Sequence, residues 1–475
     1  MSLPESIQTP FGYALAPVNL TAASQHSARL GGDERLEATV KDLLQPVYLA
    51  DGYQPRGWQR STHLIPAATP RSCYSQPLAG GSPLPELGPG THHSLSQDPK
   101  LAEKMPFFQD RQPPQPGPFR IGIHPPQGGK EESGSIRPPS LVVERLLPTR
   151  GSRNPKAKVI VAVHGLGSCK ETFLPLLDRL VRKGEEEEEE AEDHGIHQIW
   201  LIDALGHGMT SILNGGSKTS PDDLLSCQNR IVDSNDYARD LLLFLTCYLP
   251  GALEASRGSP LGPALAYSPP RLASRKVIGL GHSFGATSLL QLGVHLPDLF
   301  ESICVIEPIL IRDALVEKGR KIPLARFTLM KKASWSSREE ARRDLVKDRT
   351  SSSWDPRVRD AFVAGALCQG RKEEEVDRCC DRVAEALCIR GNRPGIQLAT
   401  GTLRHLPSRV KVLYISCSKP LLSPLEEVRS VAEGQIANLD FETLDGSHSL
   451  PQEMPDTIAD LVRSSLIRNR STSKL

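Results

Sequence analysis

Residues 276–286, with the sequence KVIGLGHSFGA, decide the fold of this chain. The first five read as a strand buried on both faces, because apolar residues follow one another without alternation. The next five match the pattern G-x-S-x-G, and residues 286–295 read as a helix. A strand, a turn and a helix in immediate succession would hold Ser283 on a sharp turn with small neighbours, which Gly281 and Gly285 provide.

Strands and helices alternate on both sides of this turn. Runs of apolar residues predict further strands at 119–123, 141–146, 158–163, 198–202, 302–306, 410–415 and 440–444. Apolar residues at helical spacing predict helices at 34–44, 171–181 and 236–249, and through 458–462. Because this order produces βαβ units, we predict an α/β fold with a mostly parallel sheet and helices on both faces.

Composition divides the chain into four segments. Of its 40 prolines, 21 lie in the first 139 residues, so the opening part is predicted to be loop-rich. The polar, helical stretch that falls between two sheet strands is predicted to be a cap over the sheet. The segments are a Pro-rich, largely irregular N-terminal arm at 1–116, the first part of the core at 117–310, the helical cap at 311–404, and the last part of the core with a targeting tail at 405–475.

Two shorter insertions interrupt the predicted core. The acidic run Glu185–Glu190 is expected to form a solvated loop tip, because like charges repel one another and favour water. Residues 251–275 are rich in proline and glycine and are expected to form a flexible loop.

Charge and cysteine usage exclude several classes of protein. The net charge of +1 lacks the basic excess of a nucleic-acid binder. No run approaches 18 apolar residues, and the N-terminus lacks a secretory pattern, so neither a transmembrane helix nor a signal peptide is expected. The ten cysteines form no C-x-x-C pair and are expected to be reduced packing residues. No metal site is expected, since Cys379, Cys380 and Cys388 lack zinc-ligand spacing.

A serine hydroxyl needs a base to act as a nucleophile at neutral pH. His448 follows the last predicted strand on a loop that contains Gly446, where a side chain can reach the serine. We therefore predict His448 as the base. The alternative for His448 is a surface histidine without a catalytic part.

An acidic residue is needed to orient that histidine. The turn after the strand at 410–415 reads SCSKPLLSP and holds no carboxylate. Glu307 follows the strand at 302–306 directly and is the predicted acid. Glu426 and Glu427 remain alternatives, as does a purely structural part for Glu307.

The oxyanion of an acyl-transfer reaction needs two backbone N–H donors. One is predicted to come from Phe284, directly after the nucleophile. The other is predicted to come from Leu166, in the glycine turn that follows the strand at 158–163. Gly165 allows the backbone of this turn to approach closely. His164 is expected to order the turn rather than to perform chemistry.

Several of these motifs together resemble the α/β-hydrolase superfamily. They are Leu201-Ile202-Asp203 leading to His207-Gly208, then Ala238-Arg239-Asp240, Gly281-His282-Ser283 and Ile306-Glu307-Pro308. The likeness is greatest to fungal peroxisomal hydrolases, a group that includes a yeast peroxisomal lipase and hydrolases of host-selective toxin biosynthesis. It covers about residues 120–310 and 405–475, and leaves the first 115 or so uncovered. It implies a serine hydrolase without a cofactor, with a lid formed by 311–404.

The tripeptide Ser473-Lys474-Leu475 matches a peroxisomal address. We therefore expect the peroxisomal import receptor as a partner and the peroxisomal matrix as the location. The address is read by a receptor and implies no membrane anchor.

These observations together predict a peroxisomal serine hydrolase that cleaves an acyl ester or acyl thioester through an acyl-serine intermediate, as lipases, esterases and thioesterases do. The expected substrate is a small acyl compound of fatty-acyl or secondary metabolism, including toxin biosynthesis. Two alternatives remain open: a non-catalytic binding protein with a hydrolase fold, and a C–C bond hydrolase with the same triad. The arm could also serve as an interaction module.

Overall fold

A computed structural model describes the greater part of the chain. The residues it describes are 18–30, 58–68, 98, 100, 139–148, 157–187, 195–214, 234–255, 261–310, 324–370, 372, 374–420 and 424–467. The predicted helix at 34–44, the predicted strand at 119–123 and the tripeptide at 473–475 lie outside these residues.

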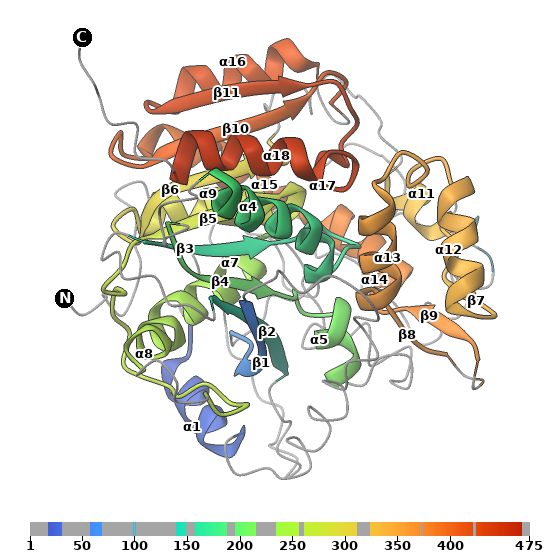
Figure 1. Ribbon diagram of the computed structural model, residues 1–475, viewed down its shortest axis with the longest axis horizontal. Helices are drawn as coiled ribbons and strands as arrows, with labels where there is room; N and C mark the ends of the chain where they lie inside the picture. The colour runs from blue at the N-terminus through green and yellow to red at the C-terminus, as the bar shows by residue number, and fades with distance from the viewer. Residues whose placement is uncertain are drawn as a thin grey trace, which may run out of the picture.

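The described residues form one large sheet of eight strands (Figure 1). In spatial order these are β1 (Trp58–Pro66), β2 (Ser140–Pro148), β4 (Ile196–Ile202), β3 (Lys158–Val163), β5 (Val277–His282), β6 (Phe300–Ile306), β10 (Lys411–Cys417) and β11 (Leu439–Leu444). β2 is antiparallel to both β1 and β4, and every other neighbouring pair is parallel. The mostly parallel α/β sheet is therefore confirmed.

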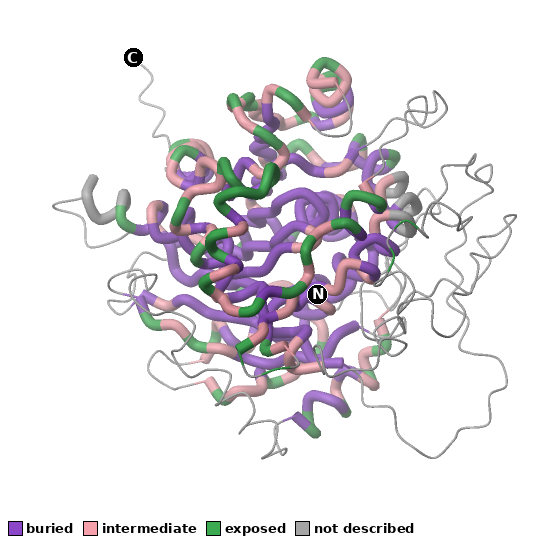
Figure 2. The backbone as a smooth tube through the Cα atoms, turned by 90° about the vertical axis from the view of Figure 1, so that its right-hand side faces the viewer, coloured by how far each residue is buried: buried purple, intermediate pink, exposed green. Residues whose placement is uncertain are grey.

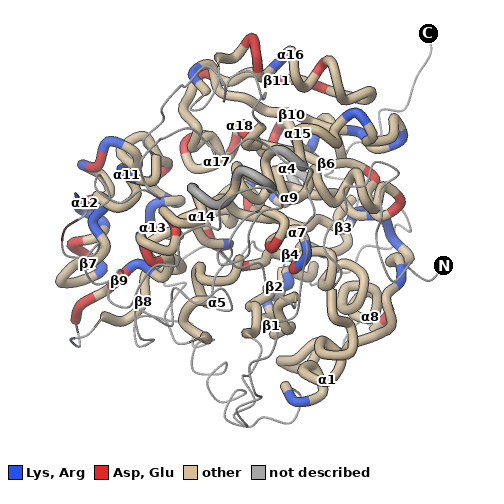
Figure 3. Tube along the Cα trace, turned by 180° about the vertical axis from the view of Figure 1, so that it is seen from behind, with Lys and Arg blue, Asp and Glu red and all other residues tan. Residues whose placement is uncertain are grey.

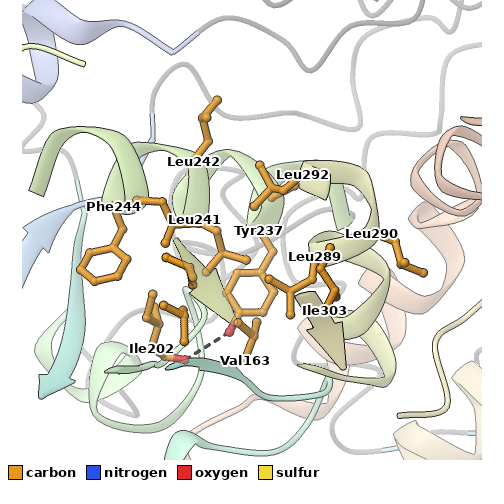
Figure 4. Packing of buried hydrophobic residues seen from close by; sticks show 14 of the residues in the cluster. Val163, Ile202, Tyr237, Leu241, Leu242, Phe244, Leu289, Leu290, Leu292 and Ile303 are labelled. Carbon is orange, nitrogen blue, oxygen red and sulfur yellow. Dashed lines mark hydrogen bonds between the residues drawn. The ribbon is translucent and has the colours of Figure 1, made fainter. Parts of the chain in front are cut away.

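Helices cover both faces of the sheet because its central strands are apolar on both sides. Along β3, Val159, Val161 and Val163 join one core, and Ile160 and Ala162 join the other. The first core packs under α7 (Ser234–Leu243) and α9 (Ser283–His295), and Figure 4 shows part of it. The second packs under α4 (Leu174–Glu187) and α18 (Pro455–Val462). Figure 2 shows the resulting layer of buried backbone through the centre of the molecule.

Shorter elements complete the two helical layers. They are η4 (Lys170–Phe173), α5 (Gly208–Leu213), η6 (Phe244–Tyr248), α8 (Leu249–Glu254), η7 (Leu403–His405), α16 (Leu425–Gln435), α17 (Leu450–Glu453) and η8 (Arg463–Ile467). Because α7, η6 and α8 follow one another without a break, the first residues of the predicted loop at 251–275 are helical instead. Glu185 to Glu187 likewise belong to α4 and not to a loop tip, in keeping with the good helix propensity of glutamate.

Two elements of the core come from the region assigned to the arm. α1 (Leu20–Leu30) packs on the core through Ala23, and the Ser27 hydroxyl donates to the carbonyl of Leu265 at 3.2 Å. β1 pairs with β2 over nine residues, from Trp58 opposite Pro148 to Pro66 opposite Ser140. The core sheet therefore includes a strand that lies before residue 117.

The cap lies between β6 and β10 in the chain and at one end of the sheet in space (Figure 1). Its helices are α11 (Leu324–Met330), α12 (Arg338–Lys347), α13 (Pro356–Gly365), α14 (Arg382–Gly391) and α15 (Arg393–Thr402). It also holds a small antiparallel sheet that the sequence did not predict, formed by β7 (Ser334–Trp335), β9 (Val376–Arg378) and β8 (Leu367–Gln369). Trp335, Phe362 and Leu367 contribute to a separate core inside the cap.

Acidic and basic residues stand close together on the outside of the cap (Figure 3). Lys332 contacts Glu340 at 2.8 Å and Asp344 at 2.6 Å, and Arg342 contacts Asp360 at 3.1 Å. Exposed ion pairs of this kind contribute little stability, typically about 0–1 kcal/mol each. The cap is therefore held together mainly by its own apolar core.

The cysteines follow the expectation for reduced packing residues. The eight that lie in the described part of the chain are buried, and none of them forms a disulfide bond: Cys169, Cys247, Cys304, Cys368, Cys379, Cys380, Cys388 and Cys417. Within the same residues, no helix has the length and apolar content to cross a bilayer, and no three His, Cys, Asp or Glu side chains gather as a metal site would require.

Candidate active site

Ser283 stands at the junction between strand β5 and helix α9, as the first residue of the helix. Its φ of 51° lies in the left-handed region, which a residue with a Cβ rarely adopts. Such strain persists only where the surrounding structure enforces it, and it gathers at functional sites. The side chain is nearly buried, with 6% of its surface exposed.

The two predicted glycines beside the serine are required by close backbone contacts. A Cβ at Gly281 would lie 2.7 Å from the Cα of Ala286. A Cβ at Gly285 would lie 2.6 Å from the carbonyl oxygens of both Val163 and His164. The turn after β3 therefore lies directly over the start of helix α9.

His448 reaches the serine from the loop after strand β11. Its Nε2 atom lies 2.8 Å from the Oγ atom of Ser283. The loop is held by Glu453, whose carboxylate accepts the backbone N–H of Ser447 at 2.8 Å and the Ser447 hydroxyl at 2.6 Å. The imidazole is thus placed within hydrogen-bond reach of the hydroxyl it would deprotonate.

Glu307 lies on the other side of the imidazole. Its Oε2 atom is 3.1 Å from Nδ1 of His448. Its Oε1 atom accepts the Ser416 hydroxyl at 2.8 Å and the backbone N–H of Cys417 at 2.7 Å. Ser416 and Cys417 end strand β10, the place where the sequence holds no carboxylate. They bind the carboxylate of Glu307, the residue directly after β6.

The surroundings of Glu307 keep its carboxyl group ionised. Burial alone would raise its pKa, but the hydrogen bond and charge of His448 and the donors of Cys417 and Ser416 hold the pKa below its ordinary value. The two alternative acids, Glu426 and Glu427, lie in the first turn of α16. The carboxylate at the Nδ1 atom of His448 is that of Glu307.

The turn after β3 lies against the serine. A Cβ at Gly165 would be 3.2 Å from the Cβ of Ser283. The Nδ1–H of His164 donates to the carbonyl of Gly165 at 2.8 Å, while its Nε2 accepts the N–H of Ala204 at 3.1 Å. Because the peptide is planar and trans, fixing the Gly165 carbonyl also fixes the Leu166 N–H on the opposite side.

His164 orders the turn in a neutral form. Burial lowers its pKa to about 4, against a smaller opposing effect of the bond to Gly165. In the part of the chain that the structure describes, no acceptor is bonded to the N–H of Leu166. Phe284 is the second residue of α9, so its N–H has no acceptor one helical turn earlier. These are the two predicted donors, and the helix N-terminus adds positive potential.

The cap meets the same turn at His207, a residue of the resemblance motif, and at Glu385, which no sequence pattern indicated. His207 accepts the N–H of Gly167 at 3.0 Å, and the thiol of Cys380 lies 3.1 Å from the same Nε2 atom. Gly167 has a φ of 73°, and a Cβ there would lie 2.7 Å from a carboxylate oxygen of Glu385. The left-handed backbone at Gly167 favours glycine, and the absence of a side chain there leaves room for the carboxylate of Glu385.

A buried charge cluster supports the turn from below. The carboxylate of Asp203 accepts the backbone N–H of Lys170 at 2.9 Å, its ammonium at 2.9 Å and the N–H of Met209 at 3.0 Å. Burial raises the pKa of Asp203 to about 6, although Lys170 opposes the shift. Arg60 of β1 pairs with Glu144 of β2 in the same cluster. Asp203, the last residue of the Leu201-Ile202-Asp203 motif, therefore holds the residues that follow the turn in place through these hydrogen bonds.

The sequence of the chain matches a known protein family. Residues 160–461 match the family model described as "Alpha/beta hydrolase family". The type I acyl-CoA thioesterase mpaH of Penicillium brevicompactum is 27% identical over 209 residues, which cover 44% of this chain and 39% of the thioesterase. The peroxisomal membrane protein LPX1 of Saccharomyces cerevisiae is 29% identical over 171 residues, 36% of either chain.

A third relative and a solved structure complete the comparison. The abhydrolase domain-containing protein AFT2-1 of Alternaria alternata is 25% identical over 145 residues, 30% of this chain and 47% of that protein. The chain thus spans less than half the length of these curated relatives. The crystal structure of the yeast peroxisomal alpha-beta-hydrolase Lpx1 superposes with a TM-score of 0.56 at 16% identity, and covers 87% of this chain and 89% of that one. That likeness shows the shared fold.

Proposed function

The chain belongs to the alpha/beta hydrolase family, and we propose that it is a serine hydrolase that cleaves an acyl ester or acyl thioester through an acyl-serine intermediate. One observation carries this proposal. The Ser283 hydroxyl lies 2.8 Å from Nε2 of His448, and Glu307 lies 3.1 Å from Nδ1 of the same ring. A nucleophile, a base and an orienting acid in that order are the parts that acyl transfer requires.

In the first step, Oγ of Ser283 attacks the carbonyl carbon of the substrate as its proton passes to Nε2 of His448. The carbonyl π electrons move onto oxygen, and the resulting oxyanion is stabilised by the N–H groups of Leu166 and Phe284. Glu307 stabilises the imidazolium and remains ionised.

In the second step, the oxyanion re-forms the carbonyl and the bond to the leaving group breaks. The leaving sulfur or oxygen takes the proton from His448 and departs as a thiol or an alcohol. Water then attacks the acyl-serine, gives its proton to His448, and the acid is released as the proton returns to Ser283. Bonds and protons balance without a cofactor.

The relatives favour a particular class of acyl substrate. The name of mpaH contains the words acyl-CoA thioesterase. The name of LPX1 contains the word peroxisomal. We propose that this chain acts on a thioester or ester of fatty-acyl or secondary metabolism in the peroxisomal matrix, with Ser473-Lys474-Leu475 read by the import receptor. C–C bond hydrolysis on the same triad is the second candidate, since the same serine and base would serve it.

The activity is tested by labelling with a fluorophosphonate probe and by a panel of p-nitrophenyl esters and acyl-CoA thioesters of short and long chain. Wild type and a Ser464→Ala control should label and turn over, because Ser464 lies in η8 and its hydroxyl donates to the carbonyl of Leu461 in α18, away from the candidate site. Ser283→Ala should do neither. Labelling of Ser283→Ala at the wild-type rate would contradict Ser283 as the nucleophile, and a folded wild type that never labels would favour a non-catalytic binding protein.

The location is tested by a fluorescent fusion at the N-terminal end, with and without residues 473–475. We expect the full sequence in peroxisomes and the shortened one in the cytosol. Import of both forms would show that another signal directs the protein.

A further inference from the structure

His282 is a buried titratable residue next to the nucleophile for which the mechanism above has no use. It is the last residue of β5, and 6% of its surface is exposed. Its Nε2 atom lies 2.8 Å from the backbone carbonyl oxygen of His448. A carbonyl can only accept, so Nε2 carries the proton and Nδ1 carries a lone pair.

The Nδ1 atom of His282 is buried and has no hydrogen-bond partner among the described residues. A buried acceptor without a partner costs about 1–3 kcal/mol, a cost that an apolar side chain of similar shape would avoid. A role for His282 in filling space alone therefore does not explain why this position holds a histidine. What an apolar ring would lack is the Nε2–H donor to the loop that carries His448.

The ring of His282 also contacts the turn after β3, which contains Gly165 and Leu166 and is called the oxyanion turn below. A Cβ at Gly165 would lie 2.9 Å from Nδ1 of His282, so the flat edge of the ring packs against the backbone of Gly165. The centre of the His282 ring also lies 5.3 Å from that of the His448 ring. One side chain thus contacts both the loop that carries His448 and the turn that contains Gly165 and Leu166.

His282 stays uncharged in this place. Burial lowers its pKa to about 3, the charge of His448 and more weakly that of His164 act in the same direction, and the His448 carbonyl and Glu307 oppose them. A neutral ring leaves the imidazolium of His448 without a second positive charge beside it. A neutral ring also keeps its single N–H on the carbonyl.

We propose that His282 is a positioning residue for the reaction: its Nε2–H holds the backbone carbonyl of His448 and thereby keeps the base aligned between Ser283 and Glu307. This inference rests on the proposed serine-hydrolase function. A base that drifts by an ångström would slow acylation without changing how substrate binds, because a misplacement of that size costs on the order of 100-fold in rate.

Three variants separate the hydrogen bond from the packing. His282→Phe keeps a flat ring and removes the donor. His282→Gln places an amide N–H where Nε2 stood, and His282→Asn carries the same amide one bond too short to reach. The readouts are the fluorophosphonate labelling rate of Ser283 and kcat and KM for p-nitrophenyl butyrate. His295→Phe, the same change at the far end of α9, is the matched control.

We expect His282→Phe and His282→Asn to lower kcat and the labelling rate roughly 10- to 100-fold with KM within about twofold. His282→Gln and His295→Phe should remain within about threefold of wild type. A His282→Phe variant that labels like wild type overturns the proposal, as does a folded His282→Gln that is as slow as His282→Asn. Should the phenylalanine variant fail to fold, the comparison of Gln with Asn still decides.

A second readout does not depend on activity, so it separates this inference from the proposed function. In the 15N NMR spectrum of histidine-labelled wild type, assigned by the His282→Gln variant, the His282 ring should show the Nε2–H tautomer with constant shifts from pH 5 to pH 8. A ring that titrates in this interval, or that shows the Nδ1–H tautomer, would overturn the inference even if the wild type labels fully.

Discussion

Ser283 and Glu307 share a left-handed backbone conformation, with φ values of 51° and 50°. Among the residues that the structure describes, no other residue apart from glycines has a positive φ. Each directly follows the last residue of one of two neighbouring parallel strands, β5 and β6. The two strained positions therefore lie at the same edge of the sheet, and His448 is hydrogen-bonded to both.

Replacing Glu307 should slow catalysis strongly. Glu307→Gln removes the charge that stabilises the imidazolium and offers an amide that can hold the wrong tautomer, so kcat should fall about 10²- to 10⁴-fold. Glu426→Gln, in the first turn of α16, should keep kcat near wild type. Steady-state kinetics on one activated ester check this. Equal kcat in the two variants would contradict Glu307 as the acid, and a larger loss for Glu426→Gln would move the assignment to α16.

The strain at Ser283 should be measurable as stability. Ser283→Ala and Ser283→Gly both lose the hydroxyl, but only glycine accepts a φ of 51° without a Cβ penalty. The glycine variant should therefore be more stable than the alanine variant, by on the order of 1 kcal/mol. Urea unfolding of the two inactive variants gives the comparison. An alanine variant of equal or greater stability would show that the left-handed conformation is not strained here.

Filling the space at Gly285 should disturb the oxyanion turn. The added Cβ in Gly285→Ala would meet two backbone carbonyl oxygens at 2.6 Å, which cannot move without moving the turn. We expect turnover to fall on the order of 100-fold or more. Gly434→Ala is the control, because nothing lies within 4 Å of a Cβ there. At the end of helix α16 this change should leave turnover intact and change stability by less than the roughly 0.5–1 kcal/mol of a helix interior.

The buried histidines should make the fold sensitive to acid, and His63 lies on β1, away from the site. Burial lowers its pKa to about 4 from the ordinary 6.5, with a smaller contribution from Arg145 and an opposing one from the Gly262 carbonyl. The unfolded chain therefore binds a proton below pH 6.5 that the folded chain refuses until about pH 4. Stability from this group is complete above pH 6.5 and is lost on acidification through that window.

His63→Gln should remove this loss. Between pH 6.5 and pH 4, the stability of the variant relative to wild type should rise by up to about 1.4 kcal/mol for each pH unit of acidification. Urea unfolding at several pH values measures the difference. Parallel curves for the two proteins would mean that the folded histidine protonates normally.

Arg60 should test whether the N-terminal strand belongs to the core. Arg60→Met leaves the buried carboxylate of Glu144 without its nearest cation and should destabilise the fold by about 3–5 kcal/mol. The double variant Arg60→Met with Glu144→Gln removes both charges and should recover part of that loss. A single variant as stable as wild type would show that β1 adds little to the core.

Much of the architecture could be predicted because the central strands are apolar on both faces and so stand out in the sequence. β1 could not, since four polar residues follow one another from Gln59 to Thr62, at positions that are exposed or half-buried, and so no apolar run or apolar alternation marks its first half. The cap sheet was missed because its strands have two or three residues. Such short strands depend on tertiary contacts rather than on a local pattern.

The candidate site likewise has a part that the sequence predicts and a part that it does not. Ser283, Glu307 and His448 each follow a strand, so the sheet topology alone brings them together. Their supporting contacts come from distant parts of the chain. The contact of Ser416 with Glu307 depends on how strand β10 packs, and the contact of Cys380 with His207 depends on how the cap packs. No local sequence pattern predicts either contact.

The hydrogen bonds from Ser416 and Cys417 to Glu307 join the two ends of the cap. Glu307 stands before the cap and Cys417 after it, 110 positions apart, yet their atoms meet at 2.7 Å. The cap is thus a closed loop whose ends are joined by the pairing of β6 with β10 and by the hydrogen bonds to Glu307. Because doubling the length of a closed loop costs only about 0.6 kcal/mol, a longer or rebuilt cap should cost the fold little as long as these two strands stay paired.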